Sequence, residues 1–90
     1  MLLCRVEGSV ISTVKHPSLK GWRLLVCQPI SKDGEPEDVP VVAIDPHGAA
    51  AGQRVMVSTD GRYAQELVGD PKSPARNTII GIVDDQEAQA

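Results

Sequence analysis

The stretch VAIDPHGAAAGQRVMVS, from Val42 to Ser58, decides how this chain folds. It opens with the end of an apolar run, Val39 to Ile44, and passes through a loop of small residues, Asp45 to Gln53. It closes with the alternating run Arg54 to Ser58. Short apolar runs bounded by Gly, Pro and Asp are typical of β-strands. The stretch therefore predicts two strands joined by a tight, small-residue loop.

Further strands are predicted on both sides of this unit. Leu2 to Lys15 alternates with a mostly apolar even face, and Gly8 in its middle predicts a bulge or a sharp bend. Trp22 to Gln28 and Asn77 to Asp84 are short and apolar on both faces, apart from the ends of the latter. Strands of that kind require cover on both sides.

One short helix is predicted between the fourth and fifth strands. It runs from Asp60 to Val68, with Asp60 as the N-cap and Gly69 as the C-terminal stop. Ser31 to Asp38 is polar and contains Gly and Pro, which predicts an exposed loop. The order β-β-β-β-α-β predicts a mainly β fold, a small barrel or partly open sheet rather than βαβ units. One short helix cannot cover the outer faces of two apolar strands, so the remaining apolar surface is expected to meet another subunit.

The composition limits the class of protein. The chain has 90 residues, which is one domain at most. Its 9 basic and 12 acidic residues give a formal charge of 9 − 12 = −3. It has no Phe, and its only aromatic residues are Trp22 and Tyr63. Because single-strand binders stack bases on aromatic side chains in a basic groove, a nucleic-acid partner is disfavoured, and the core must be aliphatic.

The two cysteines are predicted to be buried thiols. In an antiparallel hairpin centred near Ser18, Cys27 is roughly opposite Gly8 and not opposite Cys4, which argues against a disulfide. The N-terminal residues lack the pattern of a signal peptide. No apolar stretch approaches the roughly 18 residues of a membrane span. The chain therefore reads as a cytosolic protein without a membrane partner.

No catalytic residue, metal site or cofactor is predicted. The sequence contains neither a GxSxG elbow nor a Cys–His signature, and its Cys and His residues lack metal-ligand spacing. His16 is in an exposed loop and reads as a surface residue, whereas His47 is either a surface residue or part of a pore or interface. Asp45 and Asp84 are each at the end of a strand, where aspartates usually cap turns.

Three segments together resemble the EutN/CcmL family, the pentameric vertex proteins of bacterial microcompartments. They are VAIDPHGAAAGQRVMVS, GSVISTVKHPSLKGWRLLVCQP (residues 8–29) and SPARNTIIGIVD (residues 73–84). They occur in the family's order and spacing, and the resemblance spans Leu2 to Asp84. We therefore expect a single domain over residues 1–84. The tail at residues 85–90 is acidic and has no bulky apolar residue, so it is expected to be flexible.

Individual positions follow the family pattern only in part. Asp45, Gly48, Ala49 and Gly52 match its loop, whereas Ala50 stands where the family usually has glycine. Gly61, Ala64 and Gln65 match the start of the family's helix in part, with Arg62 and Tyr63 in place of two serines. Arg76 stands where aspartate is common, which reverses or removes any interface salt bridge made there.

The resemblance implies a five-stranded OB-like β-barrel that assembles into a cyclic homopentamer. Its function would be structural and not enzymatic, namely to cap the vertices of a polyhedral shell in the bacterial cytoplasm. Its partners would be the hexameric and pseudohexameric shell proteins of the facets. Two alternatives stay open. One is an oligonucleotide-binding barrel, disfavoured by charge; the other is a chaperonin-10-like ring, whose apolar loop tripeptide is missing from Ser31 to Asp38.

Two sets of residues are predicted to be functional. Small residues allow close approach of backbones near an axis, and a helix start can point N–H groups toward a pore. The expected pore or axial residues are Gly48, Ala49, Ala50, Gly52, Asp60, Gly61 and Arg62. The two-sided last strand is expected to contribute to the core and to lie near the subunit contact. The expected interface residues are Ile79, Ile80, Ile82, Asp45 and Tyr63.

Overall fold

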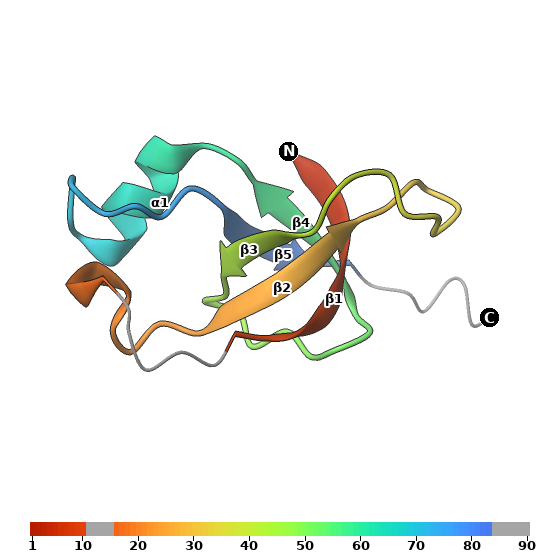
Figure 1. The fold of residues 1–90 in the computed structure, drawn as a ribbon, viewed down its shortest axis with the longest axis horizontal. Helices are drawn as coiled ribbons and strands as arrows, with labels where there is room; N and C mark the ends of the chain where they lie inside the picture. Colours follow the sequence, from red (N-terminus) through yellow and green to blue (C-terminus); the bar gives the residue numbers. More distant parts are fainter. Residues whose placement is uncertain (11–15, 84–90) are drawn as a thin grey trace.

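The computed structural model describes residues 1–10 and 16–83, which form a closed barrel (Figure 1). The strands follow the order β1-β2-β3-β5-β4 around the barrel. The predicted element order and the mainly β class are confirmed. The elements are β1 (Leu2–Ser9), a 3-10 helix η1 (Pro17–Leu19), β2 (Leu24–Pro29), β3 (Val41–Ile44), β4 (Arg54–Ser58), α1 (Gly61–Val68) and β5 (Thr78–Ile82). Predictions for residues 11–15 and for the tail from Asp84 lie outside the described residues.

Strand β1 pairs antiparallel with both β2 and β4. Its register with β2 shifts between Val6 and Gly8, so the bulge predicted at Gly8 is confirmed. The predicted register was wrong, because Cys27 pairs with Val6 and Gly8 pairs with Val26. The hairpin is centred one residue earlier than expected, and the bulge adds one more residue to β1.

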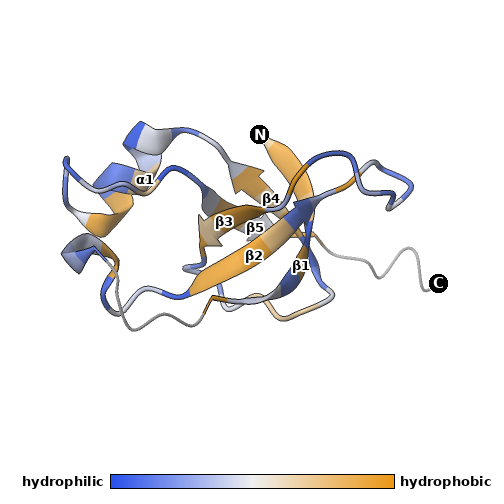
Figure 2. Cartoon of the chain, viewed as in Figure 1, coloured by the Kyte–Doolittle hydropathy of each residue, from blue (hydrophilic) through white to orange (hydrophobic). Residues whose placement is uncertain are grey.

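The barrel core is aliphatic, as the composition predicts. Figure 2 shows the apolar residues along the strands and the polar residues in the loops. Inward-facing side chains from all five strands, together with one loop alanine, form the core cluster. They are Cys4, Val6, Leu25, Cys27, Ala43, Ala49, Val55, Val57 and Ile79. Both cysteines are buried free thiols, as predicted.

The barrel wall is weakest between β3 and β5. These two strands run parallel and share a single residue pair, Ile44 with Thr78. By contrast, β2 and β3 share four pairs. Beyond the single pair, the Asn77 side-chain amide donates a hydrogen bond to the Val42 carbonyl (3.1 Å). The strand expected from Val39 begins only at Val41, because Pro40 has no backbone N–H with which to extend the sheet.

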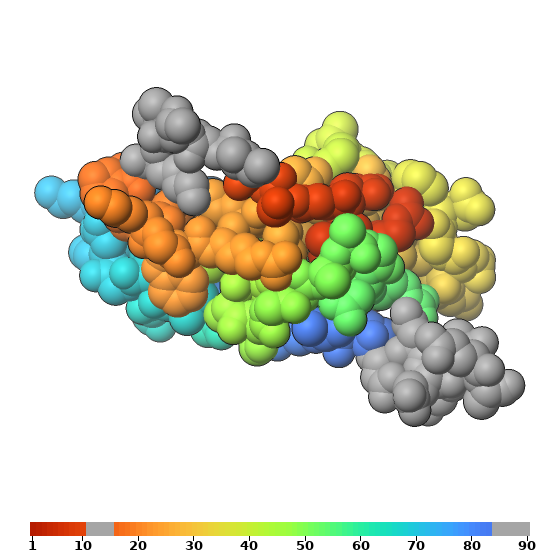
Figure 3. Space-filling view, turned by 90° about the horizontal axis from the view of Figure 1, so that it is seen from below, coloured from red at the N-terminus to blue at the C-terminus, as the bar shows by residue number. Residues whose placement is uncertain are grey.

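Helix α1 begins and ends where the sequence predicts. The Asp60 carboxylate accepts a hydrogen bond from the Arg62 backbone N–H (2.9 Å), and Gly69 ends the helix with a φ of 75°. Helix α1 and η1 lie at one end of the long axis, and the 31–38 loop lies at the other (Figures 1 and 3). None of the helices in residues 1–10 and 16–83 has the length and apolar character needed to cross a membrane.

Candidate functional site

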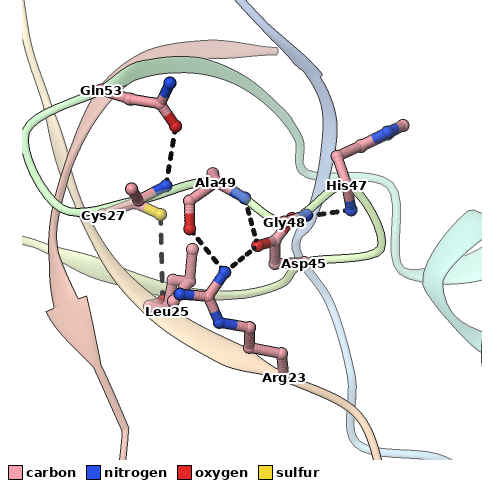
Figure 4. A network of polar contacts seen from close by, with 9 residues as sticks. Arg23, Leu25, Cys27, Asp45, His47, Gly48, Ala49 and Gln53 are labelled. Atoms are coloured by element: carbon pink, nitrogen blue, oxygen red, sulfur yellow. Dashed lines mark hydrogen bonds and ion pairs between the residues drawn. The ribbon is translucent and has the colours of Figure 1, made fainter.

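The loop between β3 and β4 is organised by the carboxylate of Asp45 (Figure 4). This carboxylate has no exposed surface, and it accepts hydrogen bonds from the backbone N–H groups of His47 (2.8 Å), Gly48 (3.1 Å) and Ala49 (2.7 Å). The guanidinium of Arg23 donates to it at 2.9 Å. Buried carboxylates are tolerated only when they are paired and hydrogen-bonded, and Asp45 meets both conditions.

Further contacts fix the shape of the same loop. Arg23 also donates to the Ala49 carbonyl, so one guanidinium holds both ends of the Asp45 turn. The Gln53 side chain accepts a hydrogen bond from the Ala50 N–H (2.7 Å). Gly48 and Gly52 have positive φ values of 80° and 88°, whereas Ala50 does not have a positive φ. Alanine is therefore tolerated where the family usually has glycine.

Two arginines lie at the start of helix α1, Arg62 on the helix itself and Arg76 on the segment before β5. Arg62 and Arg76 line an open hollow of about 520 Å³ together with Asp60, Gly61 and Gln65. A β-carbon added to Gly61 would lie 3.6 Å from the Arg76 guanidinium carbon. The two guanidinium groups add to the partial positive charge of the helix N-terminus. This end of α1 is thus an electropositive surface with a single carboxylate, Asp60, as its cap.

The structure does not bring the two parts of the predicted axial site together. The small-residue loop ends where β4 begins, and the helix start follows the other end of β4. A five-residue strand separates them by roughly 16 Å at about 3.3 Å per residue. Both parts can lie near one axis only if β4 runs roughly along that axis.

The predicted interface residues divide into buried and exposed groups. Ile79 has no exposed surface and belongs to the core, and the Asp45 carboxylate is enclosed by its own loop. These two side chains therefore serve the inside of one chain, and a contact role for them is not supported. Ile80 is half-buried, whereas Tyr63 (42% exposed) and Ile82 (39% exposed) are available to a neighbour.

One apolar surface was not singled out from the sequence. Val39 and Val42 are 71% and 48% exposed, and Val42 lines the groove beside the weak point of the barrel wall. The apolar run Val39 to Ile44 was assigned to a barrel strand, and its pattern alone does not reveal that one edge stays unpaired.

The nucleophilic and basic side chains have structural roles. Burial raises the pKa of Cys4 to about 11, and burial, with smaller contributions from Cys4 and Asp45, raises that of Cys27 to about 12. Both thiols thus remain protonated at neutral pH.

His16 is exposed and contacts the Ser18 hydroxyl (2.9 Å), which donates to the hydroxyl of Ser73 (2.7 Å). This chain of contacts anchors η1, and within residues 1–10 and 16–83 no third group orients the imidazole as a catalytic base requires. No cluster of three metal-ligating side chains occurs in residues 1–10 and 16–83.

Comparisons with known proteins agree on one family. Residues 1–84 match the family model described as ethanolamine utilisation protein EutN/carboxysome. The chain is 40% identical to the microcompartment shell vertex protein PduN of Salmonella typhimurium over 93% of its own length and 96% of PduN. It is 37% identical to the carboxysome shell vertex protein CcmL of Gloeobacter violaceus, over 93% of this chain and 83% of CcmL.

Solved structures give the same result. The GrpN pentameric microcompartment shell protein from Rhodospirillum rubrum superposes with a TM-score of 0.79 at 34% identity, covering 93% of this chain and 94% of GrpN. The structure of Gloeobacter violaceus CcmL superposes with a TM-score of 0.80 at 37% identity, covering 93% of this chain and 86% of CcmL.

Proposed function

This chain belongs to the EutN/CcmL family of bacterial microcompartment shell vertex proteins, and from that premise we propose that it works as a homopentamer. The observation that carries the proposal is its similarity, over nearly the whole chain, to PduN and to the pentameric GrpN. Five copies would close through one heterologous interface, in which each chain uses two different surfaces. The function is structural, since the family consists of shell vertex proteins and not of enzymes.

The proposed partners are shell proteins. A pentamer fits a five-fold vertex of a polyhedral shell, and the flat facets around it would be formed by hexameric and pseudohexameric shell proteins. The place of action would be the shell of a microcompartment in the bacterial cytoplasm. Relatives of both the carboxysome type and the Pdu type support a role common to different compartments.

The axial surface is proposed to include one or both ends of β4. The helix start, with Arg62 and the hollow beside Arg76, would make any opening on the axis electropositive. The Asp45 loop would supply a compact wall of small residues around Gly48 and Gly52.

The two alternative functions, an oligonucleotide-binding barrel and a chaperonin-10-like ring, have less support. Outer positions of β2 and β3, the face that OB-folds use for oligonucleotides, carry Val26 and Val42 instead of aromatic or basic residues. The 31–38 loop is fixed by hydrogen bonds, with the Ser31 N–H donating to the Glu35 carbonyl (2.8 Å). A chaperonin-10-like ring would need a mobile loop with an apolar tripeptide at this place.

The mass in solution tests the proposed function. Light scattering should give five times the chain mass of 9.6 kDa, which is 48 kDa. Coexpression with hexameric shell proteins should then yield closed particles, and omission of this chain should leave open ones. A stable monomer at micromolar concentration, or a monomer that binds single-stranded DNA, would contradict the proposal.

A further inference from the structure

We propose that the neighbouring copy of this chain docks on the apolar seam between β3 and the segment 74–77. This inference rests on the proposed pentamer and identifies one of the two surfaces from which the ring would be built. The seam is the place where the barrel wall has only the Ile44–Thr78 pair. It leaves an edge of the sheet, and the apolar side chains on it, without cover from the rest of the chain.

A groove with mostly aliphatic walls runs along the seam. Its volume is about 360 Å³, and only one charged side chain lines it. The walls come from β2, β3, η1 and the segment before β5. The lining residues are Leu19, Leu24, Val41, Val42, Ile44, Pro74, Ala75, Arg76 and Asn77. An interface core that is apolar and nearly free of charge is typical of obligate homo-oligomers.

The groove is held open by hydrogen bonds within one chain. The Ser18 hydroxyl donates to the Ser73 hydroxyl (2.7 Å), which ties η1 and Leu19 to the segment 73–77. The Gln65 amide donates to the Ser73 carbonyl (3.2 Å) from helix α1. Ser73 is itself buried, so the wall opposite β3 is fixed before any partner arrives. Such a pre-formed surface binds a partner at a lower entropic cost than a mobile one.

Exposure and charge favour a second copy as the occupant. Val42, one of the exposed large hydrophobic side chains (48%), lines the groove at the seam. Arg76, at the rim, makes no ion pair with any other side chain in the described part of the chain. Because the chain carries a net charge of −3, a neighbouring copy can bring carboxylates to this arginine. A second copy thus matches both the apolar floor and the cationic rim.

The edge beside the groove favours packing of side chains over a continued sheet. Pro40 lies next to the exposed edge of β3 and cannot donate a backbone hydrogen bond to an added strand. If neighbouring chains added strands to this edge, the sheet could extend from chain to chain without limit. A concave groove instead accepts one convex surface of a neighbouring chain in a fixed geometry. Contact through the groove is therefore compatible with a ring that closes.

The variant Val42→Asp tests the inference. A carboxylate at the centre of the groove should convert the 48 kDa species, five times 9.6 kDa, into folded monomers of 9.6 kDa. The matched control is Val39→Asp, the same substitution at a more exposed valine that precedes β3 and does not line the groove. We expect this control to remain pentameric. A pentameric Val42→Asp would overturn the inference, as would a Val39→Asp that is monomeric to the same extent.

Thiol labelling gives a second measurement that does not depend on breaking the ring. The native Cys4 and Cys27 are buried, so a maleimide reports mainly on an introduced cysteine. In the pentamer, Val42→Cys should react at least tenfold more slowly than Glu35→Cys, whose site is in the exposed 31–38 loop. Equal rates in the pentamer would overturn the inference, as would protection of Val42→Cys only after hexameric shell proteins are added. If the wild-type chain is itself a monomer, it is the proposed function that fails.

Discussion

At the scale of single residues, Asp45 is the side chain that organises the stretch quoted at the outset. Its buried carboxylate accepts hydrogen bonds from three backbone N–H groups and from the guanidinium of Arg23. A turn cap was predicted at this position, but the partnership with Arg23 was not. Arg23 is 22 residues away along the chain, and only the β2–β3 pairing brings the two side chains together.

Replacement of Asp45 by Ala should destabilise the protein strongly. Three N–H groups would lose their acceptor, and Arg23 would lose its buried partner. Because unpaired buried donors carry a desolvation penalty, we expect a loss of about 2–4 kcal/mol in the free energy of unfolding. Urea denaturation at fixed protein concentration measures it. The control is His47→Ala, whose exposed side chain can be removed at a cost within about 0.5 kcal/mol. Equal losses for the two variants would contradict this role of Asp45.

The buried thiols predict how stability depends on pH. Folding raises the pKa of Cys4 from 9.0 to about 11 and that of Cys27 from 9.0 to about 12. Between roughly pH 9 and 11 the unfolded chain therefore loses thiol protons that the folded chain retains. The free energy of unfolding should fall with rising pH over this window and be unaffected by the thiols below it.

The variant Cys27→Ala isolates this effect from other alkaline titrations. Its stability should decline less steeply than that of the wild type between pH 9 and 11, because one of the two raised thiols is gone. Denaturation midpoints at half-unit steps of pH give both slopes. Identical slopes would mean that Cys27 ionises as readily in the folded chain as in the unfolded one.

At the scale of elements, the parts with local signals were predictable and the parts that depend on pairing were not. Helix α1 was predicted at both ends because Asp60 and Gly69 each carry a local cap signal. Strand β4 was predicted over its whole length, since small residues bound it on one side and a helix start on the other. The β1–β2 register and the short β3–β5 contact depend on partners distant in sequence, which a pattern of alternation does not identify.

The same difference between local signals and strand pairing explains which features of the candidate site were predicted. The small residues from Gly48 to Gly52 and the charges around Arg62 were found from their types. That β4 separates them, and that Ile79 faces the core, follow from the closure of the barrel. The two faces of β5 read as equally apolar in sequence, and only the register with β4 decides which residue is enclosed.

Two glycines at the ends of α1 give a matched pair of variants. Gly69→Ala should destabilise by about 1–2 kcal/mol, because its φ of 75° is unfavourable for any residue with a β-carbon. Gly61→Ala should range from neutral to about 1 kcal/mol stabilising, since its φ is helical and the new methyl would meet only the Arg76 side chain at 3.6 Å. Thermal unfolding measures both. A harmless Gly69→Ala would mean that the helix end adopts another conformation.

At the scale of the whole molecule, the barrel has a small core and an incomplete wall. A chain of 90 residues buries only about two-thirds of the surface of its unfolded form. Here one seam of the barrel also has a single strand pair and a groove lined by aliphatic residues. Burying such a groove against another copy would add apolar area at the place where the isolated chain has least. The expected consequence is that folding and ring formation are coupled.

Coupling of this kind makes thermal stability depend on protein concentration. If five chains unfold from one ring, a tenfold rise in concentration should stabilise each chain by about 1 kcal/mol, or about 4–8 °C in Tm. In the folded monomers expected of Val42→Asp, Tm should be independent of concentration and lower than in the wild type. Val39→Asp serves as the control and should retain the wild-type dependence. Calorimetry over two decades of concentration separates the two behaviours. A wild-type Tm that does not change with concentration would show that the barrel is stable alone and that the seam contributes nothing to its folding.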